Sequence, residues 1–180
     1  MKLATLTHLI NQEDNTTLMA DQQLKVVGTK GYGGKTDGKP WKDSAVDEIG
    51  QETGKVRELR INPDQEGGIT VNPEDLEAVA LIDFYNGDES EVPFGDPSFR
   101  VLCCRCFKYE GGAIDTKEMR NPRWYPIDNL PKEKMIDGDM YFVPQILAGT
   151  PIKGYIRRKS DWSAIIDYKI EPCDPSELVL

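Results

Sequence analysis

The sequence predicts an α/β fold in the broad sense, and more narrowly the α+β class, with several strands and few helices. Three observations indicate it. Apolar runs of strand length recur between turns rich in Gly, Pro, Asn and Asp, one acidic segment has helical spacing, and 180 residues suffice for one domain with a substantial core. We expect that single domain to span residues 1–171 and residues 172–180 to form a loose tail.

The expected elements follow one another along the chain. Strands are expected at residues 3–10, 18–27, 76–85 and 99–109. A polar turn at 11–16 separates the first two strands, and an acidic loop with Gly and Pro at 86–98 separates the last two. Residues 55–67 are charged and lack clear periodicity, and a second helix is expected at 137–147.

The segment from Pro40 to Gly54 is the most informative part of the chain, and its pattern predicts a short helix. Proline is favoured in the first turn of a helix and glycine just after the last turn, so these two residues indicate the ends. One face carries apolar residues four apart that can pack into a core: Trp41, Ala45 and Ile49.

The other face of this helix is acidic. Glu48 and Glu52 lie four residues apart, so a helix stacks their carboxylates one turn above the other, with Gln51 beside them. Such oxygens, next to the exposed backbone of a glycine-rich bend, suit a hard divalent cation that keeps free positions for phosphate oxygens. The alternative is a solvated helix face on which the same residues are ordinary surface charge.

The stretch from Gly33 to Gly54 resembles the signature of the Nudix hydrolases, G-x5-E-x7-R-E-U-x-E-E-x-G-U, where U is apolar. Glu48 and Glu52 match two glutamates of that signature and Gly54 its last glycine. Gln51 replaces a third glutamate, which removes a charge but keeps an oxygen ligand. The glycine loop is one residue short.

Two further positions depart from the signature as a pair. Lys39 stands where the family has a glutamate, and Asp47 where it has an arginine. In the family that pair braces the loop on the helix. We expect Lys39 and Asp47 to form the same brace with reversed polarity, contributing at most ~1 kcal/mol to stability.

The resemblance continues, in the same order, over most of residues 3–170. The segments that carry it in the second half are residues 118–131, 134–144, 154–155 and 165–168. They are similar to one Nudix branch, the MutT-homologue enzymes that hydrolyse oxidised purine nucleoside triphosphates such as 8-oxo-dGTP. The resemblance implies the Nudix fold, a mixed central β-sheet sandwiched between α-helices, with residues 55–67 as an insertion.

The resemblance also implies the chemistry of the site. The implied ligands of Mg²⁺, or of Mn²⁺, are the backbone carbonyl near Gly33, with Glu48, Gln51, Glu52 and Glu118. The three glutamates are also the implied catalytic residues, and Gly34 and Lys35 belong to the phosphate loop. A nucleoside triphosphate would be hydrolysed to its monophosphate and pyrophosphate, with a metal-activated water and one glutamate as general base.

The implied base pocket departs furthest from the family. Its substrate-binding residues would be Thr5, Lys30, Ile82, Phe84, Ile136 and Asp139. Ile136 replaces a stacking tryptophan, Lys30 an asparagine, and Gly138 the first of two acids, of which Asp139 is the second. The lost stacking costs ~1–3 kcal/mol per base. Two alternatives therefore stay open: a Nudix enzyme for another nucleoside diphosphate-linked substrate, and a catalytically decayed nucleotide-binding or regulatory domain.

Composition limits the partners and the compartment. A net charge of −9 argues against a nucleic-acid polymer or an anionic membrane as main partner, whereas a small nucleotide arrives with its own divalent cation. The apolar run at 3–10 is too short for a membrane span or a signal peptide. The four cysteines form neither a disulfide framework nor a zinc spacing, so a cytoplasmic protein is expected. The single histidine, His8, is expected to be a strand residue with a local hydrogen bond.

Overall fold

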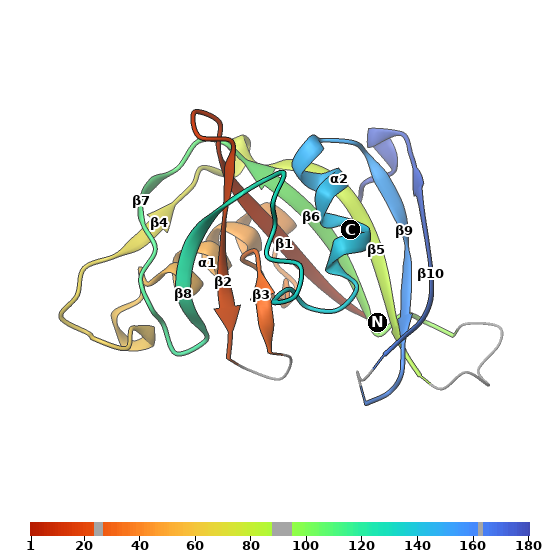
Figure 1. Cartoon of the computed structure of the whole chain (residues 1–180), viewed down its shortest axis with the longest axis horizontal. Helices are drawn as coiled ribbons and strands as arrows, with labels where there is room; N and C mark the ends of the chain where they lie inside the picture. The colour runs from red at the N-terminus through yellow and green to blue at the C-terminus, as the bar shows by residue number, and fades with distance from the viewer. Residues whose placement is uncertain (24–26, 88–94, 162–163) are drawn as a thin grey trace.

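A large mixed sheet forms the centre of the computed structural model, which describes residues 1–23, 27–87, 95–161 and 164–180. Its strands are β1 (Lys2–Asn11), β2 (Thr16–Gln22), β3 (Gly28–Lys30), β5 (Glu77–Asn86), β6 (Phe99–Cys106), β8 (Met119–Pro126), β9 (Ile152–Arg158) and β10 (Ile165–Pro172). They lie in the order β10-β9-β5-β6-β1-β2-β3, with β8 paired to β2 (Figure 1). The pairs β1–β6 and β5–β9 are parallel and the others antiparallel, so the expected mixed sheet is confirmed.

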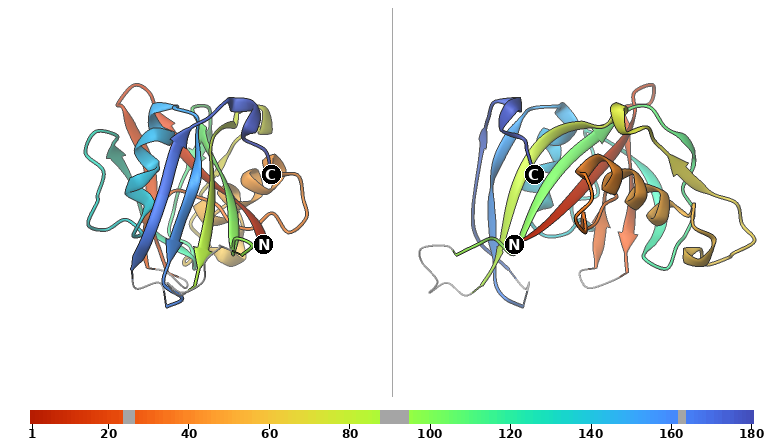
Figure 2. Two further views of the ribbon diagram at one scale, coloured as in Figure 1. Left: turned by 90° about the vertical axis from the view of Figure 1, so that its right-hand side faces the viewer. Right: turned by 180° about the vertical axis from the view of Figure 1, so that it is seen from behind.

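Two helices cover opposite faces of this sheet. Helix α2 (Val143–Ala148) lies in front of the sheet in Figure 1, whereas α1 (Trp41–Thr53) lies in front when the molecule is seen from behind in Figure 2. Phe142 and Ile146 pack with β-strand residues in one core, and Ala45 and Ile49 of α1 pack with others in a second core. The expected layered arrangement is therefore present.

Helix α1 has the ends that the sequence predicted. The carbonyl of Pro40 accepts a hydrogen bond from the Ser44 N–H at 3.0 Å, which starts the first turn. Gly54 ends the helix with a φ of 102°, a left-handed conformation that glycine adopts without strain. Among the described residues, no helix combines the length and the apolar character that crossing a bilayer requires.

Two expected elements differ from those observed. The second strand was expected at 18–27, but β2 ends at Gln22 and β3 is a separate strand; residues 24–26 lie outside the described part of the chain, as do 88–94 of the expected acidic loop. The second helix was expected to be continuous over 137–147. It is divided into a short 3-10 turn, η3 (Asp139–Tyr141), and α2. Pro144 has no N–H to donate, so it is tolerated only in a first turn, and α2 begins beside it.

The C-terminal tail is not loose, contrary to the prediction. A 3-10 turn, η4 (Pro175–Glu177), is held by a capping box that Asp174 and Glu177 form. Leu178 behind it is buried against Leu102 and Cys104. The tail covers an apolar part of the sheet, against which Trp41 of α1 also packs.

The charged segment after α1 is also organised. It contains η1 (Arg57–Leu59), and the Arg60 guanidinium donates to the carbonyls of Gly54 and Gln65 at 2.6 and 2.9 Å. A small second sheet follows, in which β4 (Gly68–Thr70) pairs with β7 (Glu110–Gly112); η2 (Pro73–Asp75) precedes β5.

The histidine and the cysteines lie where the sequence placed them. His8 is fully buried on β1, its Nδ1 is 3.5 Å from the Thr17 hydroxyl, and burial together with the Lys30 charge lowers its pKa to about 4. Cys103, Cys104 and Cys106 are buried and free, and Cys173 is free and half-buried.

Candidate active site

The glycine-rich loop is held against strand β1 by backbone hydrogen bonds. The Thr5 N–H donates to the Gly34 carbonyl at 2.9 Å, and Thr7 and Tyr32 exchange two hydrogen bonds of 2.6 and 2.9 Å. At Gly33 a Cβ would lie 2.1 Å from the Thr5 carbonyl oxygen, so this close approach requires glycine. The loop thereby presents the Gly33 peptide to helix α1.

Glu52 of α1 meets this peptide. Its Oε2 accepts a hydrogen bond from the Gly33 N–H at 2.7 Å, while its Oε1 lies 3.5 Å from the Lys30 ammonium. The same ammonium donates to the Gly33 carbonyl at 3.0 Å. Burial raises the pKa of Glu52, against the opposing effects of the Lys30 charge and the Gly33 N–H. Glu52 is thus fixed by the loop.

Glu48 lies one turn earlier on the same face. Its carboxyl group rests against Gly34, where a Cβ would come within 2.6 Å of the carboxyl carbon. Burial raises the Glu48 pKa to about 7, and the negative charges of Glu52 and Glu118 raise it further against the Lys30 charge. Negative charge is therefore crowded at this face of α1.

A cavity of about 120 Å³, here called the acidic cavity, lies beside these carboxylates. Its walls are Glu48, Gln51, Glu52, Leu59, Thr116 and Glu118. The Thr116 hydroxyl donates to the Glu52 carbonyl at 3.3 Å, which ties the segment before β8 to α1 and brings Glu118 to the cavity. The three predicted glutamates and Gln51 thus line one space, although Glu118 is 66 residues beyond Glu52 in the chain.

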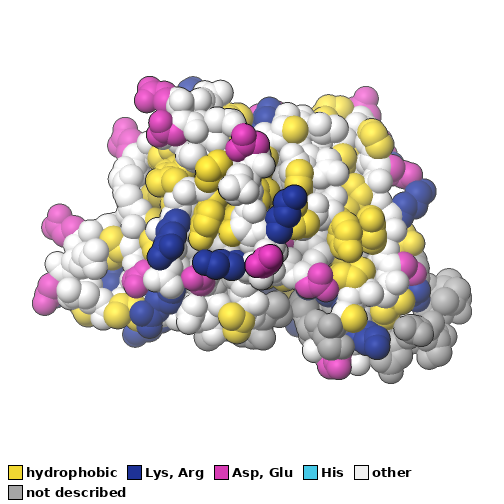
Figure 3. Space-filling view, viewed as in Figure 1, with side chains coloured by type: hydrophobic (Ala, Val, Ile, Leu, Met, Phe, Trp, Pro, Cys, Tyr) yellow, Lys and Arg dark blue, Asp and Glu magenta, His cyan; other side chains and the backbone are white. Residues whose placement is uncertain are grey.

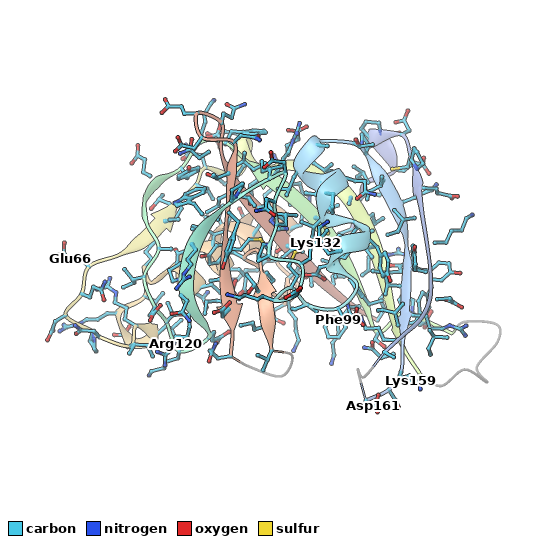
Figure 4. All side chains as sticks on the ribbon, viewed as in Figure 1. Glu66, Phe99, Arg120, Lys132, Lys159 and Asp161 are labelled. Atoms are coloured by element: carbon cyan, nitrogen blue, oxygen red, sulfur yellow. The ribbon has the colours of Figure 1, made fainter. Side chains whose placement is uncertain are left out.

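A second and larger cavity, here called the base pocket, adjoins the glycine loop. Its volume is about 560 Å³, within the usual range for small-molecule sites. Two residues of its wall, Phe99 and Asp161, are labelled in Figure 4. The predicted residues in its wall are Thr5, Lys30, Gly33, Gly34, Lys35, Phe84, Ile136 and Asp139.

Solved structures share this arrangement of sheet, helices and loop. A mutator MutT protein from Bacillus halodurans superposes with a TM-score of 0.74 at 16% identity, over 97% of this chain and all of that one. A MutT Nudix hydrolase from Burkholderia pseudomallei gives 0.53 at 14% identity, over 81% of this chain and 97% of that one. The chain has the Nudix fold. No protein-family model matches the sequence.

The acidic cavity of this Nudix fold offers donors that suit a divalent cation. Carboxylate, amide and carbonyl oxygens are the hard ligands that Mg²⁺ and Mn²⁺ prefer, and burial, with the neighbouring charge of Glu52, raises the pKa of Glu48. Across residues 1–23, 27–87, 95–161 and 164–180, however, no three His, Cys, Asp or Glu side chains converge closely enough to hold an ion as they stand. Part of the compensating charge comes from the Lys30 ammonium, bound to Gly33 and close to Glu52.

The brace of the Nudix loop has reversed polarity, as predicted. Lys39 Nζ lies 2.7 Å from Asp47 Oδ2, and both side chains are about half exposed. An exposed pair of this kind contributes ~1 kcal/mol or less to stability. Its effect is to hold the loop near the start of α1.

Two predicted positions of the base pocket have other roles. Ile82 is fully buried in the core beneath α2 and does not line the pocket; on β5 it lies two residues deeper than Phe84, which stands nearer the open end. Gly138, at the place of the missing acid, has a φ of 93°. An aspartate would be strained there, so the backbone at this position favours glycine.

One residue of the base pocket, Arg158, was missed by the sequence reasoning. Its guanidinium is buried in the pocket wall and lies 5.2 Å from the centre of the Phe84 ring. Burial raises the pKa of Asp139 to about 7, while the charges of Arg158 and Lys30 oppose that rise. The available signal was alternation along β9, which puts residue 158 on the same face as the buried Ile152 and Ile156.

Proposed function

We propose that this chain is a Nudix hydrolase that cleaves a nucleoside triphosphate to its monophosphate and pyrophosphate, most like the enzymes for 8-oxo-dGTP and other oxidised purine nucleotides. The observation that carries the proposal is the adjacency of two sites. An acidic cavity lined by Glu48, Glu52 and Glu118 stands beside a base pocket, and the glycine loop lies between them. The small, oxygen-rich acidic cavity suits a polyphosphate. The larger base pocket beside it, with its aromatic walls, suits the nucleobase joined to that polyphosphate.

In this proposal the acidic cavity holds Mg²⁺ or Mn²⁺ through Glu48, Gln51, Glu52, Glu118 and the Gly33 carbonyl. Such an ion neutralises polyphosphate charge and lowers the pKa of bound water. Glu52 is kept in place by the Gly33 N–H, and Thr116 keeps the segment of Glu118 on α1. Gly34 and Lys35 face the base pocket beside the cavity, where phosphate groups would pass.

The base pocket supports a purine as the base. Phe84, Phe99 and Phe142 contribute aromatic walls, and Asp139 and Arg158 are among its buried polar groups, with Thr5 and Lys30. A guanine edge presents donors to a carboxylate and acceptors to a guanidinium, so this pair suits an oxopurine. On the face shown in Figure 3, basic side chains lie next to acidic ones, which agrees with a small ligand; a cytoplasmic location is part of the same proposal.

The experiment is a nucleotide panel assayed with Mg²⁺ for release of the nucleoside monophosphate, the product that triphosphates and nucleotide sugars share, using the wild type and Glu52→Gln. The panel contains dGTP, 8-oxo-dGTP, dATP, an ADP-sugar and a UDP-sugar. We expect a triphosphate to be the best substrate and Glu52→Gln to lower turnover by at least ~10²-fold, because the carboxylate charge is lost where phosphoryl charge develops. Equal turnover by the two proteins would overturn the proposal.

A catalytically inactive nucleotide-binding domain is the second candidate. It is favoured by Gln51 in place of a glutamate and by the Lys30 ammonium beside Glu52. This candidate predicts that nucleotides raise the Tm of the wild type while no member of the panel is hydrolysed. Restoring the charge with Gln51→Glu would then be expected to bring activity back.

A further inference from the structure

Lys30 lies at the junction of the two cavities, in a position that the base-pocket interpretation does not account for. It is almost completely buried, and its Nζ contacts the Gly33 carbonyl and the Glu52 carboxylate. The carbonyl of Gly33 and the carboxylate of Glu52 are two of the oxygens assigned to the divalent cation. The ammonium therefore holds the same oxygens that the cation needs.

Placing both the Lys30 ammonium and a divalent cation at these oxygens is energetically unfavourable. Like charges a few ångströms apart repel strongly in a partly buried site, where water screens them little. Glu52 also has its second oxygen engaged by the Gly33 N–H at 2.7 Å. A divalent cation at Glu52 thus requires the ammonium to move away from Oε1.

The Lys30 ammonium can move to another position, within the base pocket. Lys30 also lines the base pocket, as do Gly33, Gly34 and Lys35 of the phosphate loop. A lysine is a compact charge on a flexible four-carbon stem, so its ammonium can exchange one oxygen partner for another without movement of the backbone. A phosphate group of a bound nucleotide would offer such a partner. The contact with Glu52, at 3.5 Å, is the longer of its two contacts and the easier one to exchange.

We propose that Lys30 is an exchangeable counterion, which neutralises Glu52 in the empty site and moves to a nucleotide phosphate when the base pocket fills. The inference rests on the proposed function, because it takes Glu52 to be a ligand of the divalent cation. Its consequence is that metal and nucleotide bind cooperatively. The free protein binds the ion weakly, and each ligand strengthens the binding of the other by the same factor.

The test measures binding and needs no turnover. Free Mn²⁺ is titrated by electron paramagnetic resonance with the wild type, Lys30→Met and Lys30→Gln, each with and without saturating dGMP. This monophosphate is the product class of the proposed reaction and itself chelates Mn²⁺ weakly. Lys132→Met is the matched control: it removes one positive charge from an exposed lysine, labelled in Figure 4, that lines neither cavity.

Without nucleotide, we expect Lys30→Met and Lys30→Gln to bind Mn²⁺ about tenfold more tightly than the wild type, within the roughly 5- to 150-fold range of coupled sites. Saturating dGMP should tighten Mn²⁺ binding to the wild type by a similar factor and to the variants by less. Lys132→Met should behave as the wild type. Folding of each variant is checked by thermal melting.

Folded Lys30 variants that bind Mn²⁺ no more tightly than the wild type would overturn the inference and leave the proposed function standing. If neither Lys30 variant folds, the wild type alone provides the test. If dGMP leaves the Mn²⁺ affinity of the wild type unchanged, the coupling is refuted. The variant Glu52→Gln distinguishes failure of the inference about Lys30 from failure of the proposed metal site. If it binds Mn²⁺ as well as the wild type, the ion is elsewhere, and the proposed metal site itself is overturned.

Discussion

The acidic cavity and the base pocket adjoin each other, yet the chain builds them in different ways. The acidic cavity has a volume of about 120 Å³ and draws its key side chains from one helix, α1, and the segment before β8. The base pocket, about 560 Å³, draws its walls from β1, β2, β3, β5, β6, β9, the glycine loop and η3. One site depends on local spacing, and the other depends on how distant strands come together.

Their carboxyl groups show the same contrast. Glu48 in the acidic cavity and Asp139 in the base pocket both have pKa values near 7, and burial is the leading cause for each. The balance of charge around them differs. Glu48 lies near the carboxylates of Glu52 and Glu118, which the Lys30 charge opposes, whereas the charges of Arg158 and Lys30 act on Asp139 against that of Asp137. Negative charge therefore predominates in the acidic cavity, where an ion can offset it, while the base pocket contains more positive charge of its own.

The largest expected effect tests how strictly the acidic cavity depends on the glycine loop. In Gly34→Ala the new methyl group meets the end of the flexible Glu48 side chain, so the carboxylate must move while the fold need not. A displacement of about 1 Å from productive geometry can cost ~10²-fold in rate, and we expect a loss of that size in kcat. The Tm should change little.

The matched control is Gly112→Ala, because a Cβ at Gly112 meets no described atom within 4 Å. Its activity and Tm should both stay close to those of the wild type. If Gly34→Ala retained full activity, the contact between the loop and Glu48 would have no part in the site. A large drop in Tm would instead show that the methyl group disturbs the backbone.

The sequence was sufficient for the parts that rest on local pattern. Helix α1, its end at Gly54 and the acidic face all follow from residues within one or two turns of each other. Their spacing determines which side chains share a face, whatever the rest of the chain does. The Lys39–Asp47 pair and the mixed sheet were predicted through the resemblance.

What failed depends on contacts between distant residues. The tail was expected to be loose because it is a chain end, but Leu178 covers Leu102 and Cys104 of the sheet. Ile82 was assigned to the pocket by position, and only the depth of the core beneath α2 excludes it. Arg158 was missed because an arginine at the end of a strand is usually exposed, although alternation along β9 places it on the buried face of Ile152 and Ile156.

A smaller effect is expected at the base pocket. Arg158→Met removes the built-in cation from its wall, and we expect KM for the best purine nucleotide to rise by about 30-fold, in line with ~2 kcal/mol for a charge-assisted hydrogen bond. Arg157→Met is the control, because Arg157 pairs with Asp167 of β10. A kcat that falls with KM unchanged would mean that Arg158 acts on the chemistry and not on recognition of the base.

The smallest expected effect concerns stability, and it distinguishes the contribution of Glu48 from that of Asp139. The pKa of Glu48 is raised in the folded state to about 7 from 4.5, so the fold favours its protonated form. The stability associated with that form is fully present below about pH 4.5 and is lost as the pH rises through 7. Glu48→Gln, which cannot ionise, should therefore be more stable than the wild type at pH 8 and similar to it at pH 5, when metal is absent.

We expect the difference at pH 8 to be about 1 kcal/mol, or a few degrees in Tm, because Glu48 is partly exposed and solvent screens part of the interaction. Glu58→Gln, an exposed glutamate of η1, is the control and should show no such pH dependence. Added Mg²⁺ should raise the Tm of the wild type at pH 8 more than that of Glu48→Gln, since the ion stabilises the ionised carboxylate. The contribution of Asp139 is the same in both proteins and cancels in the comparison. If Mg²⁺ raised the Tm of Glu48→Gln as much as that of the wild type, the negative charge that the ion offsets would not be that of Glu48.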